Sequence, residues 1–169
     1  MNDVTANGVV AWWGTDYQIR LGSRQITFGP EWNTYPLTDG VNVVYRKHLT
    51  TGLATYLYDG TSEIELAAPI SGHDPQFEVT NGYVAFTKQD VGGAVQVHLR
   101  SQAGTRQVSI FGTDSSPETL GPDGGLTFLN QNVRYLDLST NKVGSGLGRA
   151  TQIGGIWHVV IGRSVFRVN

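Results

Sequence analysis

The stretch Thr80-Asn81-Gly82-Tyr83-Val84-Ala85-Phe86 decides the fold, because the chain repeats its pattern. In each copy Asn or Asp precedes a glycine, and an aromatic ring closes a short apolar run four or five residues later. Asn-Gly and Asp-Gly tolerate the positive φ of a tight reversal, so each copy predicts a turn followed by a strand. The other copies follow Asn7-Gly8, Asp39-Gly40, Asp123-Gly124 and, more weakly, Gly154-Gly155.

The spacing of these glycines predicts a repeat architecture. The interval is 42 residues both from Gly40 to Gly82 and from Gly82 to Gly124. A period of about 40 to 45 residues is typical of the four-stranded blades of a β-propeller. Pro75 and Pro117 each precede their glycine by seven residues. Proline cannot donate a ladder hydrogen bond, so it indicates an edge, here the outermost strand of a blade.

Between the glycines, short alternating segments such as residues 17–21 and 24–28 are separated by turns of two or three residues. Such turns permit only antiparallel pairing, and no stretch has the period of a helix. We therefore expect an all-β fold, a small propeller of about five blades, each a three- to four-stranded antiparallel meander. The strands after the five glycines would be the inner strands, and residues 3–6 would close the ring against the C-terminal hairpin. The alternatives are a partial propeller and a β-sandwich.

Composition limits the class of protein. The 169 residues suit one domain, and we interpret 1–169 as a single propeller-like module of a longer protein, whose other domains would be its neighbours. Charged residues are 15% of the chain and the net charge is −2, which leaves no basic excess for nucleic acid. An uncharged polar surface favours an extracellular or cell-surface location. Cysteine is absent, and no apolar run approaches the roughly 20 residues that span a bilayer, so we expect no membrane insertion.

The run from Pro75 to Phe86, followed by Gln96-Val97-His98-Leu99-Arg100, resembles the repeat of TolB-like and related bacterial surface propellers. In that repeat a proline, an Asn-Gly or Asp-Gly turn, a strand ending in an aromatic and a "Tyr-Leu-Tyr-Asp" strand occur in order. Tyr56-Leu57-Tyr58-Asp59 supplies the last element. The resemblance covers roughly residues 33–138. It implies a propeller that acts as a binding platform, and it assigns no activity to any single residue.

Catalysis is not expected. A glycosidase needs two carboxyl groups about 5 to 10 Å apart, and the expected inner strands contain no Asp or Glu. The four histidines share no metal-ligand spacing such as His-x-x-x-His. We therefore predict that the chain is not an enzyme and has neither a metal site nor a cofactor.

The aromatic residues supply the binding hypothesis. Trp12, Tyr45, Phe86 and Phe128 share one repeat position, which predicts packing between blades. Aromatic residues outside that pattern are candidates for stacking on sugar rings or on a partner's side chains. We predict a non-catalytic module that binds a glycan or a surface protein at one face, through Trp13, Trp32, Tyr35, Arg46, His48, His73 and Trp157. The alternative is a structural or assembly domain of a larger exported protein or fibre, in which these aromatic residues face a neighbouring domain.

Overall fold

The structure, a computed structural model, describes residues 3–4, 10–130, 132–137, 142–145, 149–153, 156–161 and 164–167. Across these residues the chain is all-β, as expected, and contains no helix. The strands form four four-stranded sheets and one three-stranded sheet. Each sheet takes its strands in chain order with antiparallel pairing, so the predicted meanders are confirmed.

The strands have the following bounds. The first sheet contains β1 (Asp3–Val4), β2 (Val10–Trp13), β3 (Ile19–Leu21) and β4 (Arg24–Gln25). The second contains β5 (Trp32–Thr38), β6 (Val43–Leu49), β7 (Gly52–Tyr58) and β8 (Glu63–Ala67). The third contains β9 (Phe77–Thr80), β10 (Tyr83–Gln89), β11 (Val95–Ser101) and β12 (Gly104–Gln107). The fourth and fifth contain β13 (Ser116–Leu120), β14 (Leu126–Asn130), β15 (Asn132–Asp137), β16 (Lys142–Ser145), β17 (Arg149–Ile153), β18 (Ile156–Ile161) and β19 (Ser164–Arg167).

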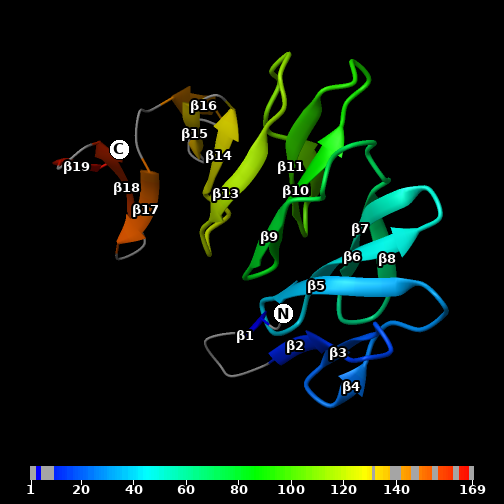
Figure 1. Ribbon diagram of the computed structural model, residues 1–169. Helices are drawn as coiled ribbons and strands as arrows, with labels where there is room; N and C mark the ends of the chain where they lie inside the picture. Colours follow the sequence, from blue (N-terminus) through cyan, green and yellow to red (C-terminus); the bar gives the residue numbers. More distant parts are fainter. Residues whose placement is uncertain are drawn as a thin grey trace.

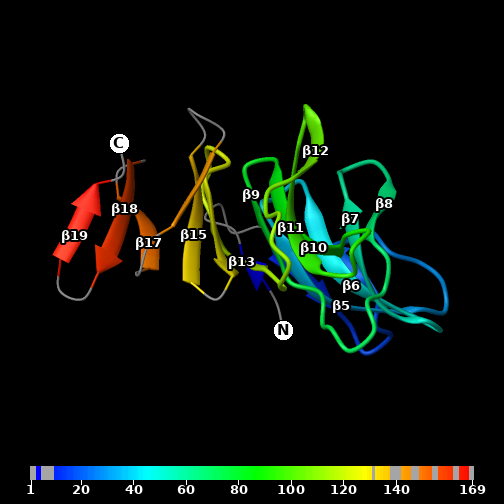
Figure 2. The ribbon, with the colours of Figure 1, turned by 90° about the horizontal axis from the view of Figure 1, so that it is seen from above.

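The sheets follow one another along an open arc (Figure 1). The first strand of each sheet lies on the inner side of this arc, and the last strand lies on the outer side. Seen from above, the sheet β17–β19 stands at one end of the molecule, and the second sheet, β5–β8, lies toward the other (Figure 2). The part of the chain that the structure describes therefore shows no closed ring.

Three details of the expected ring were wrong. The strand β1 pairs with β2 of its own sheet, Asp3 opposite Ala11 and Val4 opposite Val10, instead of with the C-terminal hairpin. The strands after the repeated glycines are the second strands of their sheets, because the preceding segments β5, β9 and β13 also pair. Pro117 lies in β13 and Pro75 just before β9, so these prolines do mark edge strands, on the inner side instead of the outer. An edge strand tolerates proline because one side of it has no ladder.

The hydrophobic core lies between successive sheets. Val43 and Tyr45 of β6 pack with the first sheet, whereas Val44 packs with Val84 and Phe86 of the third. Both faces of the second sheet are thus buried, as the alternation of side chains along a strand allows. The shared repeat position is confirmed as a packing position for three of its four aromatic rings, because Tyr45, Phe86 and Phe128 are at most 1% exposed.

The recurring turns also connect one sheet to the next. The backbone N–H of Gly82 donates a hydrogen bond of 2.7 Å to Oδ2 of Asp39, in the preceding sheet's turn. Asn81 donates from Nδ2 to the carbonyl of Pro122, 2.8 Å away in the following turn. The ring of Tyr83 lies directly over Gly124, where an added Cβ would be 2.6 Å from Cε1. The turns of the second, third and fourth sheets therefore form one connected row, which we call the turn row.

The turn row predicts that alanine substitutions at two glycines of the same backbone conformation will destabilise the fold by different amounts. Gly82 (φ 82°) has open space around it, and Gly124 (φ 83°) faces the Tyr83 ring. Gly82→Ala should cost only the strain of a left-handed backbone, about 1–2 kcal/mol. Gly124→Ala should cost a further 1–3 kcal/mol or so from overpacking. Urea denaturation measures both, and equal losses for the two variants would contradict the packing of Tyr83 on Gly124.

Asp39 makes the turn row sensitive to acid. Although partial burial acts to raise it, hydrogen bonds from Gly82 and Asn42 lower the pKa of Asp39 below its ordinary value of 3.8. A lowered folded-state pKa contributes stability that is present above the ordinary pKa and is lost as the pH falls through the folded pKa. We expect Asp39→Asn to be less stable than the wild type at neutral pH. The difference in unfolding free energy should disappear as the pH falls below the ordinary pKa of the carboxyl group. Unfolding free energies measured against pH test this, and a gap that does not change with pH would refute it.

Candidate functional site

The first feature of the site is a stacked aromatic pair that joins the first and second sheets. The rings of Tyr17 and Trp32 are 4.5 Å apart and 15° from parallel. Tyr17 belongs to the turn between β2 and β3, and Trp32 begins β5. The backbone N–H of Asn33 donates to the carbonyl of Tyr17 over 2.8 Å and holds the two segments together. Trp32 nevertheless remains 53% exposed and Tyr17 37%.

A second aromatic pair joins the same two sheets. Trp13, at the end of β2, contacts Tyr35 of β5 with ring centroids 5.5 Å apart. The register of β5 against β6 shifts between Thr34 and Leu37, and this irregularity turns Tyr35 onto the Arg46 guanidinium, 4.6 Å from its ring. Bulges of this kind re-aim a side chain. The four residues Tyr17, Trp32, Trp13 and Tyr35 form what we call the aromatic strip.

Both tyrosines of the strip have backbone conformations that bulky residues rarely adopt. Tyr17 has φ 54° and Tyr35 has φ 53°. Asn81 is the other described non-glycine residue at positive φ, and asparagine tolerates that conformation far better. Such a conformation costs on the order of 1–3 kcal/mol, and it concentrates at sites where the surrounding structure imposes it for function.

A hollow of about 570 Å³ opens beside Trp32. It is broad and shallow, with a mixed lining of apolar and polar side chains: Pro30, Glu31, Trp32, His48, Leu49, Thr50 and Thr51. Nε2 of His48 is 3.1 Å from Oγ1 of the buried Thr34, and this hydrogen bond fixes the imidazole against Trp32 at a centroid distance of 6.0 Å. The hollow thus combines an indole, an imidazole, a carboxylate and two hydroxyl groups.

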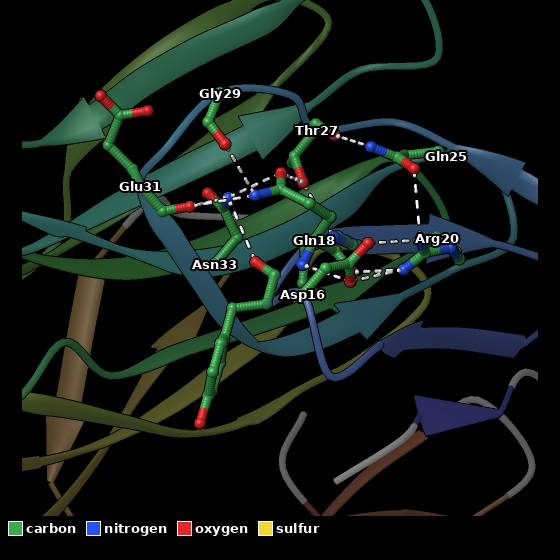
Figure 3. Close-up of polar contacts among 10 residues, drawn as sticks. Asp16, Gln18, Arg20, Gln25, Thr27, Gly29, Glu31 and Asn33 are labelled. Atoms are coloured by element: carbon green, nitrogen blue, oxygen red, sulfur yellow. Dashed lines mark hydrogen bonds and ion pairs between the residues drawn. The ribbon is translucent and has the colours of Figure 1, made fainter.

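A buried amide network supports the segment that carries Trp32 (Figure 3). Gln18 donates from Nε2 to the carbonyls of Gly29 and Glu31, at 3.0 and 3.2 Å. Its Oε1 accepts hydrogen bonds from Thr27 and from Asn33, at 2.9 and 3.3 Å. The Gln18 side chain therefore holds the connection between the first two sheets both before and after Trp32.

The third sheet repeats this network without the aromatic strip. Gln96 donates from Nε2 to the carbonyls of Phe111 and Thr113, and its Oε1 accepts from Ser109 at 2.7 Å. Ser109 accepts from the backbone N–H of Val97, as Thr27 accepts from that of Ile19. The two glutamines have the same structural task, which provides an internal control for the site.

The titratable groups around the strip stabilise it without forming a reactive cluster. Hydrogen bonding to Arg20, which lies 2.6 Å away, lowers the pKa of Asp16 to about 2, and this ion pair braces the turn that carries Tyr17. Arg46 donates to the carbonyl of Pro75 at 2.9 Å and lies 3.7 Å from Asp74. Within the described ranges no three His, Cys, Asp or Glu side chains are placed to hold a metal ion.

The structure brings five of the seven predicted site residues together: Trp13, Trp32, Tyr35, Arg46 and His48. His73 lies 3.4 Å from the Asp114 carboxylate in the connection to the fourth sheet, although the next residue, Asp74, lies beside Arg46. Trp157 lies in β18 opposite Gln152, and its side chain is outside the described residues. Tyr17 was missed, because residues 17–21 alternate like a strand, whereas β3 begins at Ile19.

No protein-family model matches this chain, and no curated protein matches it. In the part of the chain that the structure describes, no helix has the length and apolar character needed to cross a membrane.

The Gln18 and Gln96 networks should both stabilise the fold, but only the Gln18 network should affect the position of Trp32. Gln18→Ala and Gln96→Ala should each lower the free energy of unfolding by about 1–3 kcal/mol, because each leaves buried polar groups without partners. Only Gln18→Ala should change the fluorescence of Trp32, which we would isolate by replacing the other tryptophans with phenylalanine. Equal fluorescence changes in both variants would show that Gln18 has no special role in positioning Trp32.

Proposed function

We propose that this protein is a non-catalytic binding module that recognises a glycan at the aromatic strip. A sugar ring presents an apolar C–H face and a rim of hydroxyl groups. An exposed indole offers a large, rigid surface for the apolar face of the sugar. The adjacent hollow offers Glu31, Thr50 and Thr51 for its hydroxyl groups. Sites of this kind combine a mostly apolar contact with a few well-placed polar groups.

The left-handed backbone of Tyr17 and Tyr35 is the observation that carries this proposal. Packing alone gives no reason to retain two bulky residues in a costly conformation while their rings stay 37% and 45% exposed. Presentation of the rings to a ligand does give a reason. The networks around Gln18 and Arg46 hold the rings in place before binding, which reduces the entropy lost on association.

The setting of the module is part of the same proposal. The five meanders, with their first strands on the inner side of an arc, support the interpretation of the sheets as propeller blades of the TolB-like kind. The aromatic strip would then lie at the inner edge of the second blade. An extracellular or cell-surface location, within a longer protein, suits a module that binds glycans.

A glycan array followed by calorimetry tests the function. We expect Trp32→Ala to weaken binding by about 30-fold, as for a central aromatic contact worth roughly 2 kcal/mol. Tyr17→Asn should weaken it too, because asparagine keeps the left-handed backbone but removes the ring that braces Trp32. Ile110→Ala, which removes an apolar side chain that is 81% exposed in the connection between β12 and β13, is the control and should have no effect.

A wild-type protein that binds no glycan, but is captured by a purified surface protein in a Trp32-dependent manner, would replace the glycan by a protein ligand. Binding that survives Trp32→Ala would place the site elsewhere. Dependence on Trp32 only for association with a neighbouring domain would favour the assembly role.

A further inference from the structure

We propose that the ligand is an uncharged oligosaccharide of at least three sugar residues, which lies along β5 and contacts both aromatic pairs. This inference rests on the proposed function and specifies the length and charge of its ligand. It follows from the arrangement of the strip and from the charges around it.

The length follows from the two separate aromatic pairs. Trp32 lies opposite His48, and Tyr35 lies over Arg46. His48 and Arg46 are two residues apart on the regular strand β6, which corresponds to about 7 Å. A single sugar ring is shorter than this, so a monosaccharide stacked on Trp32 does not reach Tyr35. Both rings are about half exposed and both lie on the inner strand of the second sheet. A chain of sugars that leaves the hollow and follows β5 covers both.

Both pairs take one partner from the same part of the first sheet. Trp13 ends β2, and Tyr17 follows it within the turn that leads to β3. The backbone N–H of Tyr17 donates to the carbonyl of Gly14 at 3.0 Å, which keeps this turn tight. Along β5, Tyr17 therefore lies beside Trp32, and Trp13 lies beside Tyr35.

The absence of charge on the ligand follows from the groups that line the strip. Glu31 contributes a carboxylate to the hollow, and Asp74 lies beside Arg46 at the other end. Arg46 itself is covered, with only 17% of its side chain exposed, by Tyr35, the Pro75 carbonyl and Asp74. A sulfated or uronic chain would thus meet two carboxylates, and the nearest guanidinium is covered by protein groups. A neutral chain avoids that repulsion.

The test is a calorimetric titration with neutral glucose, mannose and N-acetylglucosamine oligomers of one to six residues, and with heparin and hyaluronate fragments as anionic probes. For the series that binds, we expect affinity to rise about tenfold, or about 1.4 kcal/mol, between the disaccharide and the tri- or tetrasaccharide, and then to level off. Tyr35→Asn should abolish this rise, so that the tri- and tetrasaccharide bind no more tightly than the disaccharide. Tyr35→Phe, which retains the ring, should preserve the rise.

Three results would overturn the inference. One is equal affinity for all lengths of a neutral series, and another is a uniform loss at every length in Tyr35→Asn. The third is tighter binding of the anionic fragments. In each of these cases Trp32-dependent glycan binding would still stand, whereas a failure of every probe to bind would remove the proposed function and this inference together. Circular dichroism and urea denaturation of the Tyr35 variants separate loss of contact from loss of fold.

Discussion

Hydrogen bonds between the turns of successive sheets determine how the sheets pack. A sheet with two apolar faces must bury both, and its neighbours can do so only at one relative position. On one rim, Asp39 holds the backbone of Gly82, and Asn81 holds that of Pro122. On the other rim, Gln18 and Gln96 hold the connections that lead to the next sheet. The interlocked core and the aromatic strip both depend on these contacts.

The repeating turns were the part of the fold that the sequence predicts well. Asn or Asp before glycine has a local conformational reason, so the turns and the strands that follow them were correctly placed at β6, β10 and β14. Edge strands were expected at Pro75 and Pro117, near β9 and β13, but on the outer side of the blade, and β5 was not assigned as a strand. The pairing of these strands is imposed by the neighbouring strand and not by local propensity. The pairing of β1 is likewise determined by tertiary structure and not by local propensity. The expected closure against the C-terminal hairpin was therefore wrong.

The site was predictable to the extent that it departs from the repeat. Trp13, Trp32 and Tyr35 stood out because no structural pattern required them, and the structure brings them together with Arg46 and His48. The exposure of Tyr17 depends on a left-handed backbone held by the Gln18 network and by the Asn33 contact, and no local signal in the sequence reports that conformation. His73 belongs to the connection whose Asp74 and Pro75 contact Arg46, but its own imidazole lies beside the Asp114 carboxylate.

Each described strand pairs only with strands adjacent to it in the sequence. No ladder of the described residues therefore has to wait for a distant part of the chain. Loop closure for local hairpins is inexpensive in entropy, and domains begin to fold as the chain is synthesised. Each sheet can thus be completed within about 40 residues of its start and present a finished face to the next one. A chain that leaves the ribosome N-terminus first can therefore form its sheets one after another.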